Sequence, residues 1–164
     1  MARPRGPTGT PATRAPAEAG LAHVLRTYAH DLSTGADRRA AAAALQVDPE
    51  RVLTTLLADV DGALVVAVVP AGAPLDLDLL AAAVGGRRAA LAEADRAERA
   101  TGHPAGSISP LGQASPHPIV LDASALAHET VMVCGGRPGL DVEMEPGDLI
   151  ALTGARVAPI TRRG

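Results

Sequence analysis

Glycine and hydroxyl side chains gather in the segment 106–112, Gly-Ser-Ile-Ser-Pro-Leu-Gly, between a predicted helix and a predicted strand. Glycine lets backbone N–H groups approach a ligand closely, and such donors can stabilise an oxyanion as it develops. Ser107 and Ser109 contribute the hydroxyl groups. On these residues alone, an ordinary ordered loop is the simpler interpretation, and an oxyanion-binding loop is the alternative.

A second segment, 135–141, reads Gly-Gly-Arg-Pro-Gly-Leu-Asp and combines a flexible turn with the guanidinium of Arg137 and the carboxylate of Asp141. By itself it is typical of a hairpin whose charges are solvated. Cys134, just before it, is the only cysteine, so the chain can form no internal disulfide and no cysteine-rich zinc site. We interpret Cys134 as a small residue at a strand end, because a lone cysteine usually behaves as a buried hydrophobe.

Several familiar catalytic patterns are absent from the sequence. No Gly-Lys-Ser/Thr ending is present that would complete a phosphate-binding loop, and no Gly-x-Ser-x-Gly elbow is present that would carry a nucleophilic serine. The histidines at 23, 30, 103, 117 and 128 do not have the spacing of metal ligands. We therefore expect neither a metal nor a cofactor.

The composition predicts one soluble domain with an unusual core. The chain has 164 residues, of which 47% are hydrophobic, and Tyr28 is its only aromatic residue, so Ala, Val, Leu and Ile must fill the interior. All fifteen basic residues are arginine, which stays protonated, and the net charge of −3 does not indicate nucleic-acid binding. Neither a signal peptide nor a membrane-spanning stretch is recognisable, which predicts a cytoplasmic protein with no membrane partner.

The first thirty residues are predicted to contain a tail, a helix and a strand. Residues 1–17 hold four prolines and no periodic apolar residues, which predicts a disordered Pro/Gly/Arg-rich tail before a single domain over 18–164. From Glu18, apolar residues at 21, 24 and 25 favour a helix, and a short strand is expected over 26–30.

The remaining pattern mixes helices and hairpins without regular βαβ spacing. Helices are expected over 37–46, 76–84 and 91–100, with a short helix after Pro146. Strands are expected over 54–60 and 64–69, joined by an Asp61-Gly62 turn, and over 118–122, 130–134, 140–144 and 155–160. These elements predict an α+β fold, with helices against a largely antiparallel mixed sheet.

Several of these segments, taken in order, resemble the YbaK/EbsC family, the editing domain associated with prolyl-tRNA synthetase. The resemblance covers almost the whole chain from about residue 19. Its most specific signatures are Ser-Ile-Ser-Pro-Leu-Gly at 107–112 and Gly-Gly-Arg-x-Gly-Leu-Asp at 135–141. Further matches lie at 27–31, 48–56, 75–77 and 101–102.

The resemblance implies a barrel-like mixed sheet flanked by helices and an aminoacyl-tRNA deacylase activity of the hydrolase or lyase class. The expected substrate is a mischarged tRNA, in particular cysteine on tRNA(Pro), and prolyl-tRNA synthetase is an optional partner. In such enzymes the substrate's own thiol attacks its ester carbonyl. Proximity then supplies much of the barrier reduction, and backbone donors hold the oxyanion.

Carried over to this sequence, the resemblance places catalytic positions at Thr54, Gly106 and Ser107. Substrate-binding positions are Tyr28, Thr55, Ser109, Cys134, Gly135, Arg137 and Asp141.

The main departure from the family pattern is Thr54, because relatives typically read Lys-Thr-Leu at 54–56. The chain contains no lysine at all, and Arg137 or Arg99 are candidates to restore the positive charge. The alternative hypothesis is therefore a non-catalytic module that binds tRNA or a synthetase.

Overall fold

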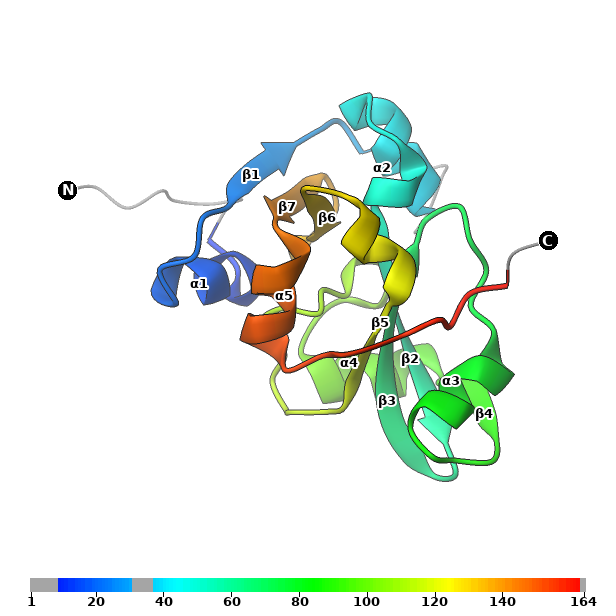
Figure 1. The fold of residues 1–164 in the computed structure, drawn as a ribbon. Coiled ribbons are helices and arrows are strands. Elements are labelled where there is room, and N and C mark those ends of the chain that lie inside the picture. Colours follow the sequence, from blue (N-terminus) through cyan, green and yellow to red (C-terminus); the bar gives the residue numbers. More distant parts are fainter. Residues whose placement is uncertain (1–8, 31–36, 163–164) are drawn as a thin grey trace.

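The computed structural model describes residues 9–30 and 37–162, whose strands form two sheets flanked by helices (Figure 1). The first sheet is antiparallel, in the order β1 (Val24–Thr27), β7 (Leu140–Met144) and β6 (Val131–Cys134). The second has the order β4 (Ala89–Leu91), β2 (Leu53–Val60), β3 (Ala63–Pro70), β5 (Ile119–Asp122) and β8 (Arg156–Ala158). The pairs β3–β5 and β5–β8 are parallel, and a parallel bridge from Val52 to Met132 joins the sheets.

The central hairpin forms where the sequence predicts it. Strands β2 and β3 pair over their full length, from Leu53 opposite Pro70 to Val60 opposite Ala63. At the turn, Asp61 and Gly62 both have positive φ, 51° and 93°, which is the conformation that a tight two-residue hairpin turn requires. Residues of β3 are buried on both faces of the sheet, as its continuous apolar sequence indicates.

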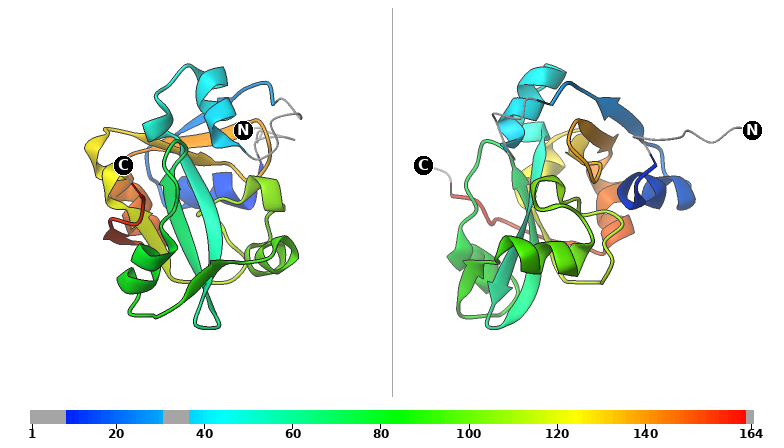
Figure 2. Two further views of the ribbon diagram at one scale, coloured as in Figure 1. Left: turned by 90° about the vertical axis from the view of Figure 1, so that its right-hand side faces the viewer. Right: turned by 180° about the vertical axis from the view of Figure 1, so that it is seen from behind.

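The helices cover the two sheets from different sides, with α2 (Arg38–Leu45) at one end of the molecule and α3 (Leu77–Ala83) and β4 at the other (Figures 1 and 2). Asp37 caps α2, which ends in a left-handed residue at Gln46, and Asp76 caps α3. The α-helices after α1 are α2 (Arg38–Leu45), α3 (Leu77–Ala83), α4 (Ala94–Thr101) and α5 (Pro146–Thr153), and the 3-10 turns are η2 (Pro49–Arg51), η3 (Ala105–Ser107) and η4 (Ala123–Ala127). No helix in the described part of the chain has the length and apolar character to cross a membrane.

Aliphatic and methionine side chains make up the buried hydrophobic clusters. The main cluster lies between the sheets and includes Leu57, Val68, Val133 and Val142, all at most 4% exposed. A second cluster packs α3 onto the other face of the five-stranded sheet. A third, with Ala41, Ala42, Val52 and Met132, packs α2 beside the bridge between the sheets. The alanine-rich helix α2 therefore covers the place where the two sheets are bridged.

The N-terminal predictions need correction. Pro11–Glu18 form a helix, α1, where disorder was expected, because Thr10 forms a reciprocal capping box with Thr13 and Ala12 is fully buried. The helix predicted from Glu18 is also wrong: Gly20 takes a φ of 71°, which ends α1, and β1 follows as an extended strand. Residues 1–8 of the predicted tail lie outside the described residues.

The predicted fold class is confirmed as a mixed α+β arrangement with largely antiparallel pairing. The described strands are divided between two sheets, which does not confirm the barrel-like closure. The short strand β4 has no counterpart in the sequence-based prediction, because its three residues Ala-Ala-Leu carry no strand signal of their own.

Candidate active site

A cavity of about 220 Å³ lies beneath α2, bounded by the end of β1, the turn η3 and the end of β6. It gathers four of the residues that the sequence analysis singles out, namely Tyr28, Gly106, Ser107 and Cys134. These come from three segments separated by more than twenty residues each, so only the folded chain brings them together. The complete lining also includes Ala29, His30, Asp37, Arg38, Ala40, Ala41, Ala43, Ala44 and Pro138.

The cavity owes its space to the alanine run of α2. Between Arg38 and Leu45 every residue after Arg39 is alanine, and four of these alanines line the cavity. Alanine is the best helix former, so the run makes a stable helix while projecting only a methyl group from each position. Larger side chains at these positions would fill the space.

A buried ion pair stands at the edge of this cavity. The Arg38 guanidinium donates from Nη1 to Asp141 Oδ1 at 2.9 Å and from Nη2 to Asp141 Oδ2 at 2.7 Å. Its Nε donates to the Leu53 carbonyl at 3.1 Å, and Nη1 also reaches the Tyr28 hydroxyl at 3.3 Å. The Arg38 side chain is 9% exposed and that of Asp141 is 0% exposed. Two parallel hydrogen bonds to one carboxylate fix the plane of the guanidinium.

Electrostatics keep the Arg38 guanidinium charged although it is buried. Burial alone lowers the pKa of Arg38, but the hydrogen bonds and charge of Asp141 more than reverse this and raise it above its ordinary value. The guanidinium is therefore a permanent cation at the cavity wall, and its formal charge is balanced by one buried carboxylate.

The ion pair also affects two further titratable side chains of the cavity, those of Tyr28 and Cys134. Burial, together with the negative charge of Asp141, raises the pKa of Tyr28, while Arg38 opposes the shift. Burial likewise raises the pKa of Cys134, again against the influence of Arg38. Cys134 is 6% exposed and stays a thiol at neutral pH, whereas a nucleophile would need the thiolate.

The turn η3 presents a backbone donor at the cavity. The Ser107 N–H donates to the Pro104 carbonyl at 2.8 Å and is therefore used within the turn. Gly106 precedes this first hydrogen bond, so the turn makes no use of its N–H. Gly106 is exposed and lines the cavity, while the Ser107 side chain is buried at its edge. Gly106 is thus the better placed of the two to offer an amide to a ligand.

The remainder of the loop is fixed by internal hydrogen bonds. His103 is 3% exposed, and its Nδ1 accepts from the Ser109 N–H at 3.1 Å. The Ser109 hydroxyl accepts from the Leu111 N–H, and its carbonyl accepts from Gln113. Burial lowers the pKa of His103, so its imidazole is neutral and can keep accepting at Nδ1. Ser109 is fully buried and does not line the cavity, which makes it a support for the loop.

The structure places the other predicted site residues outside the cavity lining. Thr54 lies opposite Val69 in the pairing of β2 with β3. The Val69 side chain packs in the hydrophobic cluster beneath α3. Thr55 is 9% exposed, and its hydroxyl has no partner among the described residues. Gly135 donates to the Leu140 carbonyl in the β6–β7 turn, and Arg137 donates to the Pro138 carbonyl beside it. Asp141 acts on the cavity through Arg38.

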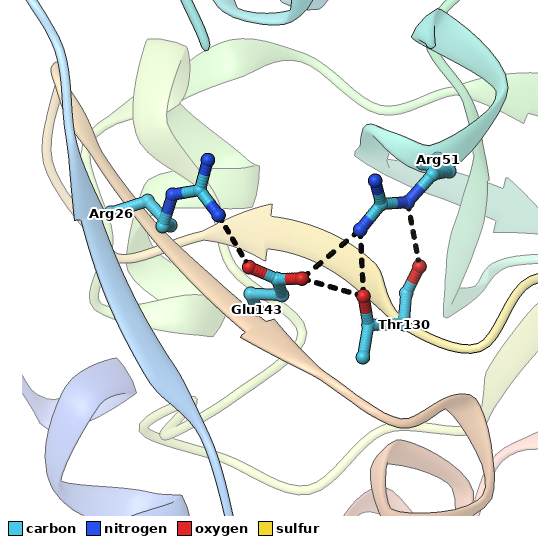
Figure 3. A network of polar contacts seen from close by, with 4 residues as sticks. All are labelled: Arg26, Arg51, Thr130 and Glu143. Carbon is cyan, nitrogen blue, oxygen red and sulfur yellow. Dashed lines mark hydrogen bonds and ion pairs between the residues drawn. The ribbon is translucent and has the colours of Figure 1, made fainter. Parts of the chain in front are cut away.

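A second cluster of polar side chains surrounds Glu143 of the three-stranded sheet (Figure 3). None of its residues lines the cavity. Glu143 accepts from Arg26 at 2.6 Å, from Arg51 at 3.0 Å and from the Thr130 hydroxyl at 2.6 Å. Arg51 also donates to the hydroxyl and the carbonyl of Thr130. The Thr130 hydrogen bond lowers the pKa of Glu143, burial opposes this, and the two arginines lower it further. These contacts tie β1 and η2 to the sheet.

Comparison with known proteins identifies the family. The family model described as "Aminoacyl-tRNA editing domain" matches residues 33–152, which is most of the chain and includes the whole loop 103–112 and the turn 135–141. The chain belongs to the aminoacyl-tRNA editing domain family. The resemblance seen in the sequence is thereby confirmed.

The chain is also similar to a curated protein in sequence and to solved structures in fold. A protein of Enterococcus faecalis, named EbsC for a Cys-tRNA(Pro)/Cys-tRNA(Cys) deacylase activity that its name marks as provisional, is 32% identical over 99 residues. That match spans 60% of this chain and 60% of the relative. A solved structure described provisionally as a trans-editing enzyme for prolyl tRNA synthetase has a TM-score of 0.83 at 24% identity, over 98% of this chain and 100% of that one. A scaffold used for epitope grafting has a TM-score of 0.84 at 24% identity, over 97% and 100%. At this identity the two structures establish the fold alone.

Arg38 is the cavity residue that sequence reasoning missed. Arg99 and Arg137 were the cations expected from the sequence, but neither lines the cavity, and the exposed Arg99 side chain pairs with Asp95 on α4. The available signal was the strand Leu140–Met144, which alternates apolar residues with Asp141 and Glu143. Two carboxylates on one face of a half-covered strand require cationic partners, and Arg38 and the pair Arg26 and Arg51 meet that requirement. Within residues 9–30 and 37–162, no cluster of three or more His, Cys, Asp or Glu side chains could hold a metal ion.

Proposed function

We propose that this editing domain is an aminoacyl-tRNA deacylase whose preferred substrate is cysteine attached to tRNA(Pro), with the cavity beneath α2 receiving the aminoacyl group. The observation that carries the proposal is the meeting of Tyr28, Gly106, Ser107 and Cys134, from distant segments, around one small cavity. A volume of about 220 Å³ suits a small amino acid and the end of the ribose to which it is attached. Membership of the editing domain family supports the class of reaction.

The reaction that we propose needs no protein nucleophile. The cysteine thiol of the substrate attacks the carbonyl carbon of its own ester, which forms a carbon–sulfur bond and turns the carbonyl oxygen into an oxyanion. Collapse of this intermediate breaks the ester bond, leaves a cyclic thiolactone, and returns the thiol proton to the departing ribose oxygen. The protonated state of Cys134 is consistent with this route, because the chain's own thiol is a poor nucleophile.

The protein's part is then to orient the substrate and to stabilise the oxyanion. A cavity that holds thiol and carbonyl in contact supplies the proximity on which an intramolecular attack depends. Gly106 lines the cavity, so its backbone N–H is placed to donate a hydrogen bond to the developing oxyanion. Since the alanine wall of α2 offers no hydrogen-bonding side chain, it favours a compact, weakly polar amino acid.

Deacylation of tRNA(Pro) charged with Cys, Ala, Ser or Pro tests the proposal. We expect cysteine to be removed fastest and serine slowly, because a hydroxyl replaces the thiol nucleophile. Gly106→Val keeps the backbone N–H but places a branched side chain where the ester carbonyl should approach it, so the rate should fall by roughly a hundredfold, as when one oxyanion donor can no longer be used. Gly147→Val is a matched control, since no atom lies within 4 Å of the Cβ it would add and Gly147 is outside the cavity.

The second candidate function is a non-catalytic module that binds tRNA or a synthetase. The threonine at position 54, where relatives typically carry lysine, favours it. The same assay separates the two candidates: a module without catalytic activity would bind charged tRNA and hydrolyse none of the four. Prolyl-tRNA synthetase, as a partner that improves turnover, is tested by adding it to the reaction.

A further inference from the structure

We propose that Arg38 is the substrate-facing cation of this editing domain, and that Asp141 holds it in position to donate a hydrogen bond to the ester carbonyl oxygen. The inference rests on the proposed deacylase function and deepens it. It assigns the positive charge, which the family resemblance led us to expect on a lysine at position 54, to a different residue on a different element. Helix α2 provides this charge where β2 does not.

Within the described residues, one N–H group of the Arg38 guanidinium makes no hydrogen bond. A guanidinium has five N–H groups. Within the described residues, Nε is used by the Leu53 carbonyl, Nη1 by Asp141 and the Tyr28 hydroxyl, and Nη2 once by Asp141. One N–H of Nη2 is therefore without an acceptor in this part of the chain, on a side chain that lines the cavity.

The charge balance indicates a carbonyl oxygen as the acceptor. Asp141 is fully buried and neutralises Arg38, so the pair as a whole has little net attraction for a distant anion such as a phosphate. An ester carbonyl is uncharged in the ground state and becomes negative only as the thiol attacks. A fixed N–H of a cation that is already desolvated stabilises this change strongly, because the donor needs no reorganisation at the moment of reaction.

A purely structural role is the competing explanation, and the second arginine cluster provides its reference. Arg51 also pairs with a carboxylate of β7 and ties an element to the same sheet, but it does not line the cavity. If Arg38, like Arg51, only holds the sheet together, neither replacement should lower the rate of the folded protein, whatever it does to stability. If Arg38 meets the substrate, the two should differ in kcat.

The test compares Arg38→Ala with Arg51→Ala in the full chain, using single-turnover deacylation of Cys-tRNA(Pro). We expect kcat to fall about a hundredfold for Arg38→Ala and to stay within about twofold for Arg51→Ala. Guanidinium ions at low concentration should restore part of the activity of Arg38→Ala, because they fit the vacated space, whereas sodium at equal ionic strength should not. A variant that is inactive only because it is misfolded would not be rescued.

Tyr28 supplies a readout that is independent of activity. It is the only tyrosine in a chain without tryptophan, so its ultraviolet titration reports on this cavity alone. Arg38 lowers the pKa of Tyr28, and Arg38→Ala should raise it, while Arg51→Ala should leave it unchanged. A conservative variant, Arg38→Lys, keeps the charge but loses the fork that binds both Asp141 oxygens, so it should recover only part of the rate.

The outcomes separate this inference from the function on which it rests. If the unchanged chain deacylates Cys-tRNA(Pro) and Arg38→Ala does so equally fast, Arg38 is not the substrate-facing cation, although the proposed function stands. Equal losses for the two variants, without rescue by guanidinium, would make both arginines structural and would also overturn the inference. If the unchanged chain deacylates none of the four charged tRNAs, the proposed function fails and the inference fails with it.

Discussion

Two arginine–carboxylate clusters lie on one face of the three-stranded sheet, and they differ in what surrounds them. Asp141 and Glu143 are two residues apart on β7, so their side chains point to the same face. The Arg38–Asp141 pair is almost completely buried and borders the cavity, whereas Arg26 and Arg51 remain 34% and 28% exposed around Glu143. The two clusters therefore use the same kinds of side chain in different surroundings. Only the Arg38–Asp141 pair, which is buried beside the cavity, is suited to contact with a substrate.

The largest expected difference between the clusters is in stability. Asp141→Ala leaves the Arg38 guanidinium buried without its partner, and we expect the free energy of unfolding to fall by about 3–5 kcal/mol. Glu143→Ala should cost only about 1 kcal/mol, because Arg26 and Arg51 can turn towards solvent. Denaturant-induced unfolding measures both. Equal losses would mean that burial does not distinguish the clusters.

The pH dependence of stability should separate the cavity loop from the Glu143 cluster. The pKa of His103 is lowered in the folded chain, so below about pH 6.5 the unfolded chain takes up a proton that the folded chain does not, and stability falls with falling pH. The pKa of Glu143 is also lowered, but its contribution is complete above about pH 4.3 and is lost only below that value.

Two substitutions test which residue causes the change of stability in each pH range. His103→Asn keeps an acceptor for the Ser109 N–H and should flatten the stability profile between pH 6.5 and 5, by at most about 1.4 kcal/mol per pH unit. Glu143→Gln should flatten the profile only below about pH 4.3. Unfolding curves across this pH range give the comparison, and a loss at pH 5 that persists in His103→Asn would assign the loss to another group.

The smallest expected effect is that of Thr54→Lys. Position 54 is not part of the cavity lining, whereas Arg38 already places a cation at the cavity. We therefore expect the rate of Cys-tRNA(Pro) deacylation to stay within about twofold of the unchanged chain. A tenfold gain would show that a lysine at this position reaches the substrate, and the role given to Arg38 would then need revision.

Much of the fold was predictable because its signals are local. The Asp61-Gly62 turn, the Asp37 and Asp76 caps and the apolar run of β3 each contain the physical reason for the element that they form. Helix α1 was not predictable in the same way. Its prolines resemble those of a disordered tail, and its stability depends on the burial of Ala12 against residues more than a hundred positions away.

The candidate site was predictable only in part for the same reason. Glycine- and serine-rich segments can be recognised along the chain, and their resemblance to the editing-domain family led to Gly106, Ser107 and Cys134, which do line the cavity. The partnership of Arg38 with Asp141 spans 103 positions, and an arginine at the start of an alanine helix carries no local sign of it. Only the alternation of apolar and acidic residues in β7 indicated that buried carboxylates needed partners.

The most direct test of the account asks whether the cavity beneath α2 is where the aminoacyl group binds. Ala44→Leu enlarges an exposed residue of α2 that lines this cavity, and Ala151→Leu makes the same change at an exposed position of α5 away from it. The measurement is the rate of Cys-tRNA(Pro) deacylation by the two variants and the unchanged chain. We predict a loss of at least about tenfold for Ala44→Leu, since added methylenes in a small pocket change discrimination by that order, and no change for Ala151→Leu. Equal rates for all three proteins would contradict the assignment of the cavity.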